Sequence, residues 1–283
     1  MTRGIVYSLD GENENCVGDG TTDYFLKEVL ISADSVKRRN PNLPITIFTN
    51  KHENLLHDSG YFESILPCLV DSHTRPYINK IAACLNSPYD ETLYLDCDTY
   101  VLVSLENVYA KGFEAYNDTG DLFSILDSFD MAFCLESLGA AKGETHPTIP
   151  DTFSRFNTGV MLFKKNKKTK EFLTDWFESY RDSTNFDPSK HDQWQFRLSL
   201  WNSDIRYCTL DHAYNQRFYT ETGAAGDGSH LVKTPYWRHH PNNPGMFWDY
   251  VNKMNYSNPF KIVHDRLLMH NLDKWYNGKY YNI

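Results

Sequence analysis

Leu93-Tyr-Leu-Asp96-Cys-Asp98-Thr-Tyr-Val-Leu102 is the stretch that decides the fold, because two carboxylates follow directly on an apolar, β-rich segment. Side chains alternate along an extended strand, so we expect Asp96 and Asp98 to share one face and Cys97 to take the other. A strand end keeps both acids out of the core, where unpaired charges are costly. The pair therefore predicts a site for a hard divalent cation such as Mn²⁺ or Mg²⁺ and the phosphates it carries.

The first half of the chain alternates short apolar runs with segments of helical spacing. We expect strands at 4–9, 44–50 and, more weakly, 65–70, and helices at 24–39 and 78–85; another β-rich piece covers 100–103. This strand-helix rhythm is typical of a mostly parallel sheet flanked by helices, an α/β fold whose ligands lie beyond the carboxyl ends of the strands. Asp96 and Asp98 follow such an end.

The second half keeps this pattern less regularly. Strands are expected at 131–135 and 158–163, a polar loop at 138–154, and an amphipathic helix at 167–181 whose aromatic face suits core packing. We find no internal repeat and no linker, so the sequence predicts a single domain.

Composition limits the class of protein. A chain of 283 residues with 41% apolar content can bury a sizeable core. A net charge of -9 argues against a nucleic-acid partner, since phosphate-backbone binding needs a broad basic surface. No apolar run approaches the ~20 residues of a membrane-spanning helix, and the first residues enter a strand pattern without a signal peptide. A soluble, cytoplasmic protein is expected.

Six cysteines are scattered along the chain without Cys-x-x-Cys or cysteine-histidine zinc spacing. We expect them to be mostly reduced, with Cys84, Cys97 and Cys134 in the core.

An ordered series of motifs surrounds the acidic pair. It comprises Ile5-Val-Tyr-Ser-Leu-Asp10, Arg75-Pro-Tyr-Ile-Asn-Lys80, Leu93-Tyr-Leu-Asp-Cys-Asp98, Phe156-Asn-Thr-Gly-Val-Met-Leu-Phe163, His191-Asp-Gln-Trp194, and a late histidine near Lys274-Trp275. In order and approximate spacing the chain resembles nucleotide-diphospho-sugar glycosyltransferases of the GT-A fold, most closely glycosyltransferase family 8. The resemblance implies one GT-A domain over 1–283, with a Rossmann-like nucleotide-sugar-binding half at about 1–103. The acceptor-binding half and a C-terminal metal and diphosphate segment follow at about 104–283.

The resemblance also implies a ligand set for Mn²⁺ or Mg²⁺. Asp96 and Asp98 would bind the ion, with Asp98 the more direct ligand and Asp96 also near the ribose. The family adds a late histidine, and here two compete: we favour His270, with His264 as the alternative. Lys274, which follows His270, would reach the diphosphate. A hydrogen-bonded histidine without a metal is the competing interpretation of either ring.

Other positions are assigned to the nucleotide-sugar. Tyr7 and Asp10 would lie at the nucleoside, and Asn157 in a turn that faces donor sugar and acceptor. Arg75 and Lys80 would offset the diphosphate charge that one ion leaves, although each alone suits a solvated helix position.

Asp192 and Gln193 resemble the pair that lies beside the transferred sugar in the family, and they are the catalytic candidates. The competing interpretation of Asp192 is an acid at a helix N-terminus, where it stabilises the helix dipole.

These features predict metal-dependent transfer of a hexose or pentose from a nucleotide-diphosphate donor, a UDP-sugar, to a hydroxyl acceptor such as a glycan, with retention favoured. If the reaction inverts, Asp192 or Glu136 would act as base. A sugar nucleotidyltransferase is a second hypothesis, weakened because the loop at 10–14 is acidic instead of glycine-rich and basic. A third is a non-catalytic carbohydrate or nucleotide-sugar-binding module.

Overall fold

The computed structural model describes residues 1–10, 24–71, 75–106, 120–136, 148–183, 192–216 and 261–264. Four of the sequence predictions therefore lie outside the described residues, namely His270, Lys274, the acidic loop after Asp10 and most of the polar loop at 138–154.

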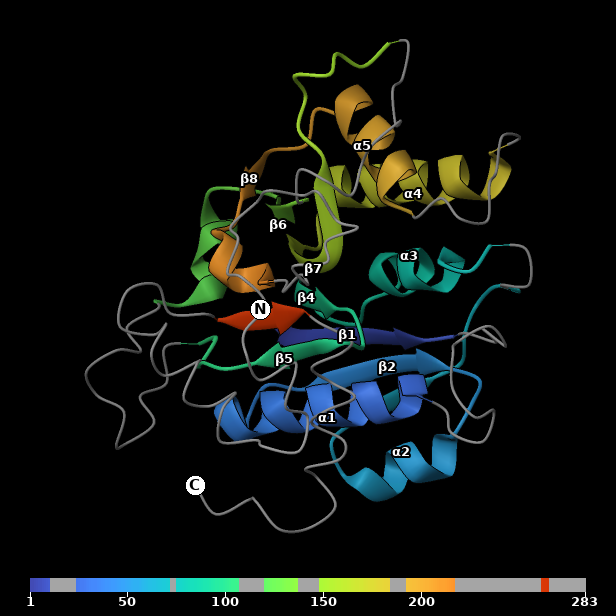
Figure 1. Cartoon of the computed structure of the whole chain (residues 1–283), viewed down its shortest axis with the longest axis vertical. Helices are drawn as coiled ribbons and strands as arrows, with labels where there is room; N and C mark the ends of the chain where they lie inside the picture. Colours follow the sequence, from blue (N-terminus) through green and yellow to red (C-terminus); the bar gives the residue numbers. More distant parts are fainter. Residues whose placement is uncertain are drawn as a thin grey trace, which may run out of the picture.

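A seven-stranded sheet forms the centre of the protein, in the order β3-β2-β1-β4-β7-β6-β8 (Figure 1). The strands are β1 (Arg3–Leu9), β2 (Ile45–Thr49), β3 (Ser64–Leu66), β4 (Glu91–Leu95), β6 (Met131–Leu135), β7 (Phe156–Lys164) and β8 (Tyr207–Thr209). Only β7 runs antiparallel to its neighbours in this sheet. The predicted α/β class with a mostly parallel sheet is confirmed.

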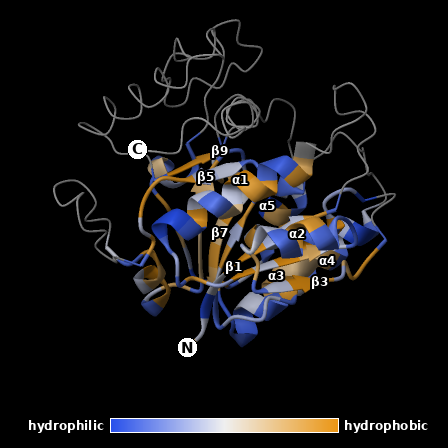
Figure 2. Ribbon diagram, turned by 90° about the horizontal axis from the view of Figure 1, so that it is seen from below, coloured by the Kyte–Doolittle hydropathy of each residue, from blue (hydrophilic) through white to orange (hydrophobic). Residues whose placement is uncertain are grey.

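Helices cover both faces of the sheet. Figure 1 places α1 (Tyr24–Arg39) and α2 (Glu53–Ser59) on one side, and α3 (Ile78–Leu85), α4 (Lys167–Asp182) and α5 (Gln193–Asn202) on the other. Side chains of β1 alternate between two hydrophobic cores, one on each face of the sheet. Ile5 and Tyr7 pack on the α1 side, and Val6 packs on the α3 side. The central strands are accordingly hydrophobic, whereas the helices carry both hydrophilic and hydrophobic residues (Figure 2).

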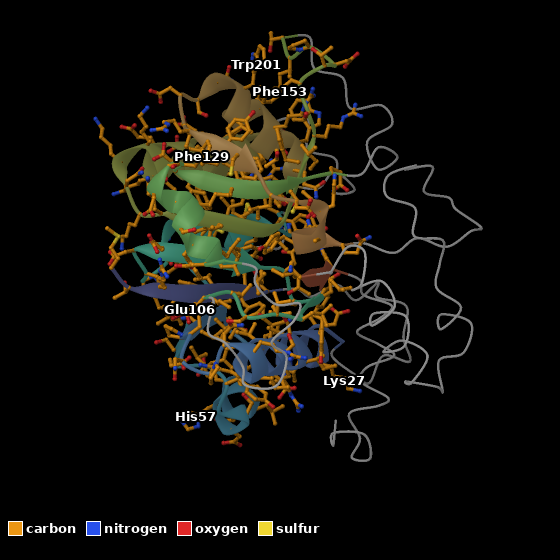
Figure 3. The ribbon with its side chains drawn as sticks, turned by 90° about the vertical axis from the view of Figure 1, so that its left-hand side faces the viewer. Lys27, His57, Glu106, Phe129, Phe153 and Trp201 are labelled. Carbon is orange, nitrogen blue, oxygen red and sulfur yellow. The ribbon has the colours of Figure 1, made fainter. Side chains whose placement is uncertain are left out.

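Aromatic side chains gather at the end of the molecule that lies opposite α2. Phe153 and Trp201 lie together there, at the end opposite His57 of α2 (Figure 3), with ring centroids 5.1 Å apart. The Arg197 guanidinium lies over the Phe153 ring and donates to the carbonyls of Pro150, Phe153 and Ser154. This arginine thereby fixes the segment that leads into β7.

Most predicted elements are confirmed, and β3 is shorter than expected. The periodicity did not predict α2, α5, β8, the 3-10 helices η1 (Leu122–Asp127) and η2 (His212–Asn215), or a second sheet. That sheet pairs β5 (Thr99–Val101) antiparallel with β9 (Ile262–His264). Of the three cysteines expected in the core, Cys84 and Cys134 are buried, and Cys97 is half-buried against it; the described cysteines are not joined by disulfides. None of the helices in the described ranges combines the length and apolarity needed to cross a bilayer.

Candidate metal and donor-binding site

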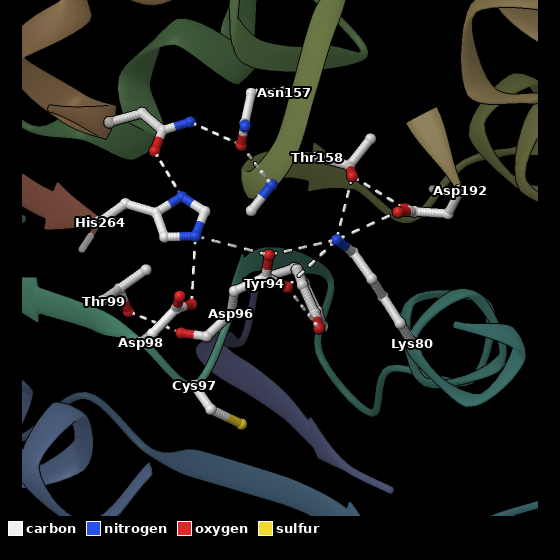
Figure 4. A network of polar contacts seen from close by, with 12 residues as sticks. Lys80, Tyr94, Asp96, Cys97, Asp98, Thr99, Asn157, Thr158, Asp192 and His264 are labelled. Atoms are coloured by element: carbon white, nitrogen blue, oxygen red, sulfur yellow. Dashed lines mark hydrogen bonds and ion pairs between the residues drawn. The ribbon is translucent and has the colours of Figure 1, made fainter. Parts of the chain in front are cut away.

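Three potential metal ligands meet where β4 passes into β5. Pairing of β5 with β9 sets His264 opposite Thr99, directly beside the acidic pair. Nε2 of His264 lies 3.1 Å from Asp98 Oδ1 and 3.8 Å from Asp96 Oδ2 (Figure 4). One ligand atom from each residue falls within 4.8 Å of the other two. Of the two competing histidines, the structure thus brings His264 to the acids.

A turn, instead of an extended strand, carries the two acids. The sequence prediction was wrong here: β4 ends at Leu95, and residues 97 and 98 form a turn before β5 begins. The Thr99 backbone N–H and hydroxyl both donate to the Asp96 carbonyl, at 3.3 and 2.8 Å, and close this turn. Cys97 still takes the opposite side, where its thiol donates to the Ser8 carbonyl.

The donor set fits a divalent cation. Two ligands on opposite sides of Mg²⁺ stand about 4.2 Å apart, and the distances of 3.1 and 3.8 Å from His264 Nε2 to the two acids lie within that span. The site has an excess of negative charge, because Lys80 pairs with both Asp96 and Asp192 while the Asp98 carboxylate faces the His264 ring. An imidazole among carboxylates suits Mn²⁺ better than Mg²⁺, which prefers oxygen ligands and water.

Lys80 connects the acidic pair with Asp192 (Figure 4). Its buried Nζ lies 3.1 Å from Asp96 Oδ1 and 3.4 Å from Asp192 Oδ2, and donates to the Thr158 hydroxyl at 3.0 Å. Burial works to lower the pKa of Lys80, but the carboxylates of Asp192 and Asp96 outweigh it and raise that pKa above its usual value. The site therefore holds a fixed positive charge beside the candidate metal ligands.

Asp192 does not use its carboxylate to cap a helix. It precedes α5, yet its side chain makes no capping hydrogen bond and instead accepts from the Thr158 hydroxyl at 2.8 Å. Its backbone carbonyl accepts from the Trp176 indole N–H. Asp192 thus stands at the N-terminus of α5, as the competing interpretation expected, while its carboxylate faces Thr158 and Lys80; contact with a sugar stays a prediction. Gln193 is half-buried as the first residue of α5, and its role stays a prediction.

The Tyr7 ring is fully buried between β1 and α1, and burial raises the pKa of its hydroxyl. That hydroxyl contacts Ser32 Oγ at 2.7 Å, and Ser32 in turn contacts the Thr99 hydroxyl at 3.0 Å. Tyr7 thus lies beneath the turn that carries the acids. Contact between Tyr7 and a nucleoside stays a prediction.

Asp10 and Arg75 lie at the ends of other elements. Asp10 follows β1 and accepts from the amide of Asn79, a residue of α3 that also bonds both backbone groups of Val70. The Arg75 guanidinium donates to the carbonyls of Arg181 and Ser183, so it caps the C-terminal end of α4. Their contacts with a nucleotide stay predictions.

An irregularity in β7 shapes the wall of the site. Phe133 pairs with Met161, but the next residue of β6, Cys134, pairs with Asn157, so residues 158–160 lack a partner on β6. Such bulges re-aim side chains next to active sites. Here the bulge sends Thr158 toward Lys80 and lets the Asn157 amide reach Glu136. The sequence marked the turn at residues 157–159, which includes Thr158, but it gave no signal for Asn215, which contacts His264 from η2.

Glycine at 159 is a steric requirement of this site. A Cβ built there would lie 2.3 Å from His264 Cε1 and 2.8 Å from Asp96 Oδ2. We expect Gly159→Ala to push these two ligands apart and weaken Mn²⁺ binding at least tenfold, the scale seen when a support of a ligand is lost. Mn²⁺ titration followed by electron paramagnetic resonance measures this. Gly60→Ala, whose Cβ meets nothing within 4 Å but whose φ of +70° strains the backbone away from the site, is the control for a general loss of stability. Unchanged Mn²⁺ affinity in Gly159→Ala would contradict the assigned geometry.

Comparison with known proteins identifies the fold. No family profile matches the chain, and no curated protein matches it. Among solved structures it is similar to the glycosyltransferase GlyE of Streptococcus pneumoniae TIGR4, with 16% identity, a TM-score of 0.54 and 93% of this chain covered. The chain spans 54% of the length of GlyE.

Two further structures match along nearly their whole length. The galactosyltransferase LgtC, solved with donor and acceptor sugar analogues, shares 15% identity with a TM-score of 0.52 over 98% of this chain and 97% of its own. Mouse xyloside xylosyltransferase 1 shares 12% identity with a TM-score of 0.52 over 93% and 97%. The chain therefore has the GT-A fold of these glycosyltransferases.

Proposed function

We propose that the protein is a metal-dependent glycosyltransferase that uses a nucleotide-diphosphate sugar, a UDP-sugar, and is similar to family 8. The observation that carries the proposal is the meeting of Asp96, Asp98 and His264 with buried Lys80 after the carboxyl end of β4. In α/β sheets ligands bind at such strand ends. The donor and acceptor analogues of the LgtC structure support the substrate class by analogy of fold alone.

In this proposal Asp96, Asp98 and His264 hold Mn²⁺. The bound ion supplies Lewis-acid stabilisation of the charge that develops on the diphosphate. Lys80 adds a fixed positive charge that needs no reorganisation during the reaction, and Thr158 and Asp192 hold its ammonium in place. Asp192 and Gln193 would then lie beside the sugar and orient it against the acceptor oxygen.

The remaining assignments belong to the same proposal. Residues 1–283 would form one domain, with donor contacts from Tyr7, Asp10, Arg75, Asn157 and Lys274, and the acceptor bound by the second half.

Retention belongs to the proposal through the resemblance to family 8. The Asp192 carboxylate accepts from Thr158 and faces the Lys80 ammonium. Glu136 accepts from the Asn157 amide. A carboxylate in such contacts keeps further lone pairs, so Asp192 or Glu136 would be the base if the reaction inverts. The anomeric configuration of the product distinguishes the two outcomes.

Incubation with a panel of nucleotide-sugars, with Mn²⁺ or with a chelator, tests the function. We expect release of free nucleoside diphosphate that requires Mn²⁺ and rises when the acceptor is supplied. Formation of pyrophosphate would instead establish the nucleotidyltransferase hypothesis. Donor binding without any turnover, over the whole panel, would establish the non-catalytic module.

A further inference from the structure

We propose that Asn215 is a positioning residue, which keeps a proton on Nδ1 of His264 and so presents Nε2 as the metal ligand. The inference rests on the proposed role of His264 as a ligand. Asn215 is the last residue of η2, and η2 lies against β9 because the His264 backbone N–H donates to the Gln216 carbonyl. Its Oδ1 lies 2.8 Å from His264 Nδ1.

The direction of this contact follows from two groups that cannot reverse their roles. The Gly159 backbone N–H only donates, and it donates to Asn157 Oδ1 at 2.9 Å. The Glu136 carboxylate accepts, and it receives the Asn157 amide N–H at 2.9 Å. Both contacts therefore fix the same orientation of the Asn157 side chain, with its oxygen away from Glu136.

The orientation of Asn157 then fixes that of Asn215. Because Asn157 Oδ1 is an acceptor, Asn215 must turn its NH₂ group toward it, and the two atoms lie 2.8 Å apart. The Asn215 oxygen is left facing His264, so Nδ1 of the imidazole must be the donor. All three side chains are buried, and a reversal of Asn215 would set its oxygen against Asn157 Oδ1, acceptor facing acceptor.

This chain of contacts matters because the acids alone would favour the opposite tautomer. Asp98 and Asp96 face Nε2, and without the chain they would draw the proton of a neutral ring to that nitrogen. A protonated Nε2 cannot bind a metal. The hydrogen bond from Nδ1 to Asn215 keeps the lone pair of the neutral ring on the side of the acids, as supporting shells of metal-bound histidines do.

Nitrogen-15 NMR of the imidazole tests the inference without a metal. Spectra are recorded with chelator over an alkaline pH series in which the ring becomes neutral, and His264 is assigned by its loss in His264→Gln. We expect the wild-type ring to keep its proton on Nδ1, and Asn215→Leu to move it to Nε2. A wild-type ring that carries its proton on Nε2 overturns the inference. An Asn215→Leu variant whose ring keeps the proton on Nδ1 also overturns it. If the variant does not fold, the wild-type spectrum alone decides.

Mn²⁺ affinity separates this inference from the proposed function. Asn215→Leu should weaken Mn²⁺ binding about 10–100-fold. Asn215→Asp sets an oxygen against Asn157 Oδ1 but still accepts from Nδ1, so it should bind Mn²⁺ more tightly than Asn215→Leu; the reverse order would overturn the inference. If His264→Gln leaves Mn²⁺ binding unchanged, the ligand role of His264 fails while the tautomer result stands. If His264→Gln weakens Mn²⁺ binding but Asn215→Leu binds Mn²⁺ as tightly as wild type, the positioning role of Asn215 fails and the ligand role of His264 stands.

Discussion

Replacement of Asp98 by Asn is expected to reduce Mn²⁺-dependent release of nucleoside diphosphate about a thousandfold, because the variant removes a charged ligand of the ion that stabilises the departing diphosphate. Asn has the shape of Asp, so the turn between β4 and β5 should persist. The Asp98 oxygen lies 3.1 Å from His264 Nε2, where a neutral amide oxygen is a weaker Mn²⁺ ligand than a carboxylate. Initial rates over a series of Mn²⁺ concentrations give both the loss of turnover and any loss of metal affinity.

Asp58→Asn is the matched control for this experiment. Asp58 is exposed on α2, and its partner is an equally exposed histidine, His57. Its variant should turn over at the wild-type rate. A similar rate and an unchanged Mn²⁺ dependence in Asp98→Asn would refute the role given to the acidic pair.

The second large effect is on stability. We expect Lys80→Met to lower the free energy of unfolding by about 3 kcal/mol, because it leaves the carboxylate of Asp192 buried without a counter-charge. Met fills much of the volume of Lys, so cavity formation contributes little. Urea unfolding in the presence of chelator measures the loss. The double variant with Asp192→Asn should recover most of it, since the stranded charge is then gone.

Lys167→Met provides the comparison for a lysine in a surface ion pair. Its side chain is 87% exposed and faces Glu171 one helical turn away, so the change should cost less than about 0.5 kcal/mol. If Lys80→Met costs no more than Lys167→Met, or if Asp192→Asn adds to the loss, the buried ion pair does not have the energetic role assigned here.

The spacing of apolar residues predicted those strands and helices that bury one regular apolar face. The strand at 4–9 and the helix at 78–85 match β1 and α3 closely, since their apolar spacing reports burial directly. The same local patterns placed Lys80 on the helix that became α3, and Asp96 directly after the apolar run that became β4. By contrast, α5 has no clear apolar face because Arg197 is buried among loop carbonyls, and its periodicity gave no helical signal.

The choice between the two late histidines was beyond such reasoning. His264 lies in a strand of three residues, whose partner β5 is far away in sequence. Register between such distant strands depends on tertiary packing, and a short apolar run cannot encode it. The same is true of Asn215, whose role depends on the contact of η2 with β9. The acidic turn was mispredicted because an i to i+3 hydrogen bond from Thr99 replaced the extended backbone.

The central claim is that Asp96, Asp98 and His264 bind one divalent ion that holds the diphosphate of the donor. Thermal unfolding with UDP, Mn²⁺ or both tests it most directly in wild type, His264→Gln and His270→Gln. We predict that UDP with Mn²⁺ raises the midpoint of wild type and His270→Gln by several degrees, that UDP alone does not, and that His264→Gln loses the shift. A shift that persists in His264→Gln and disappears in His270→Gln would contradict the claim.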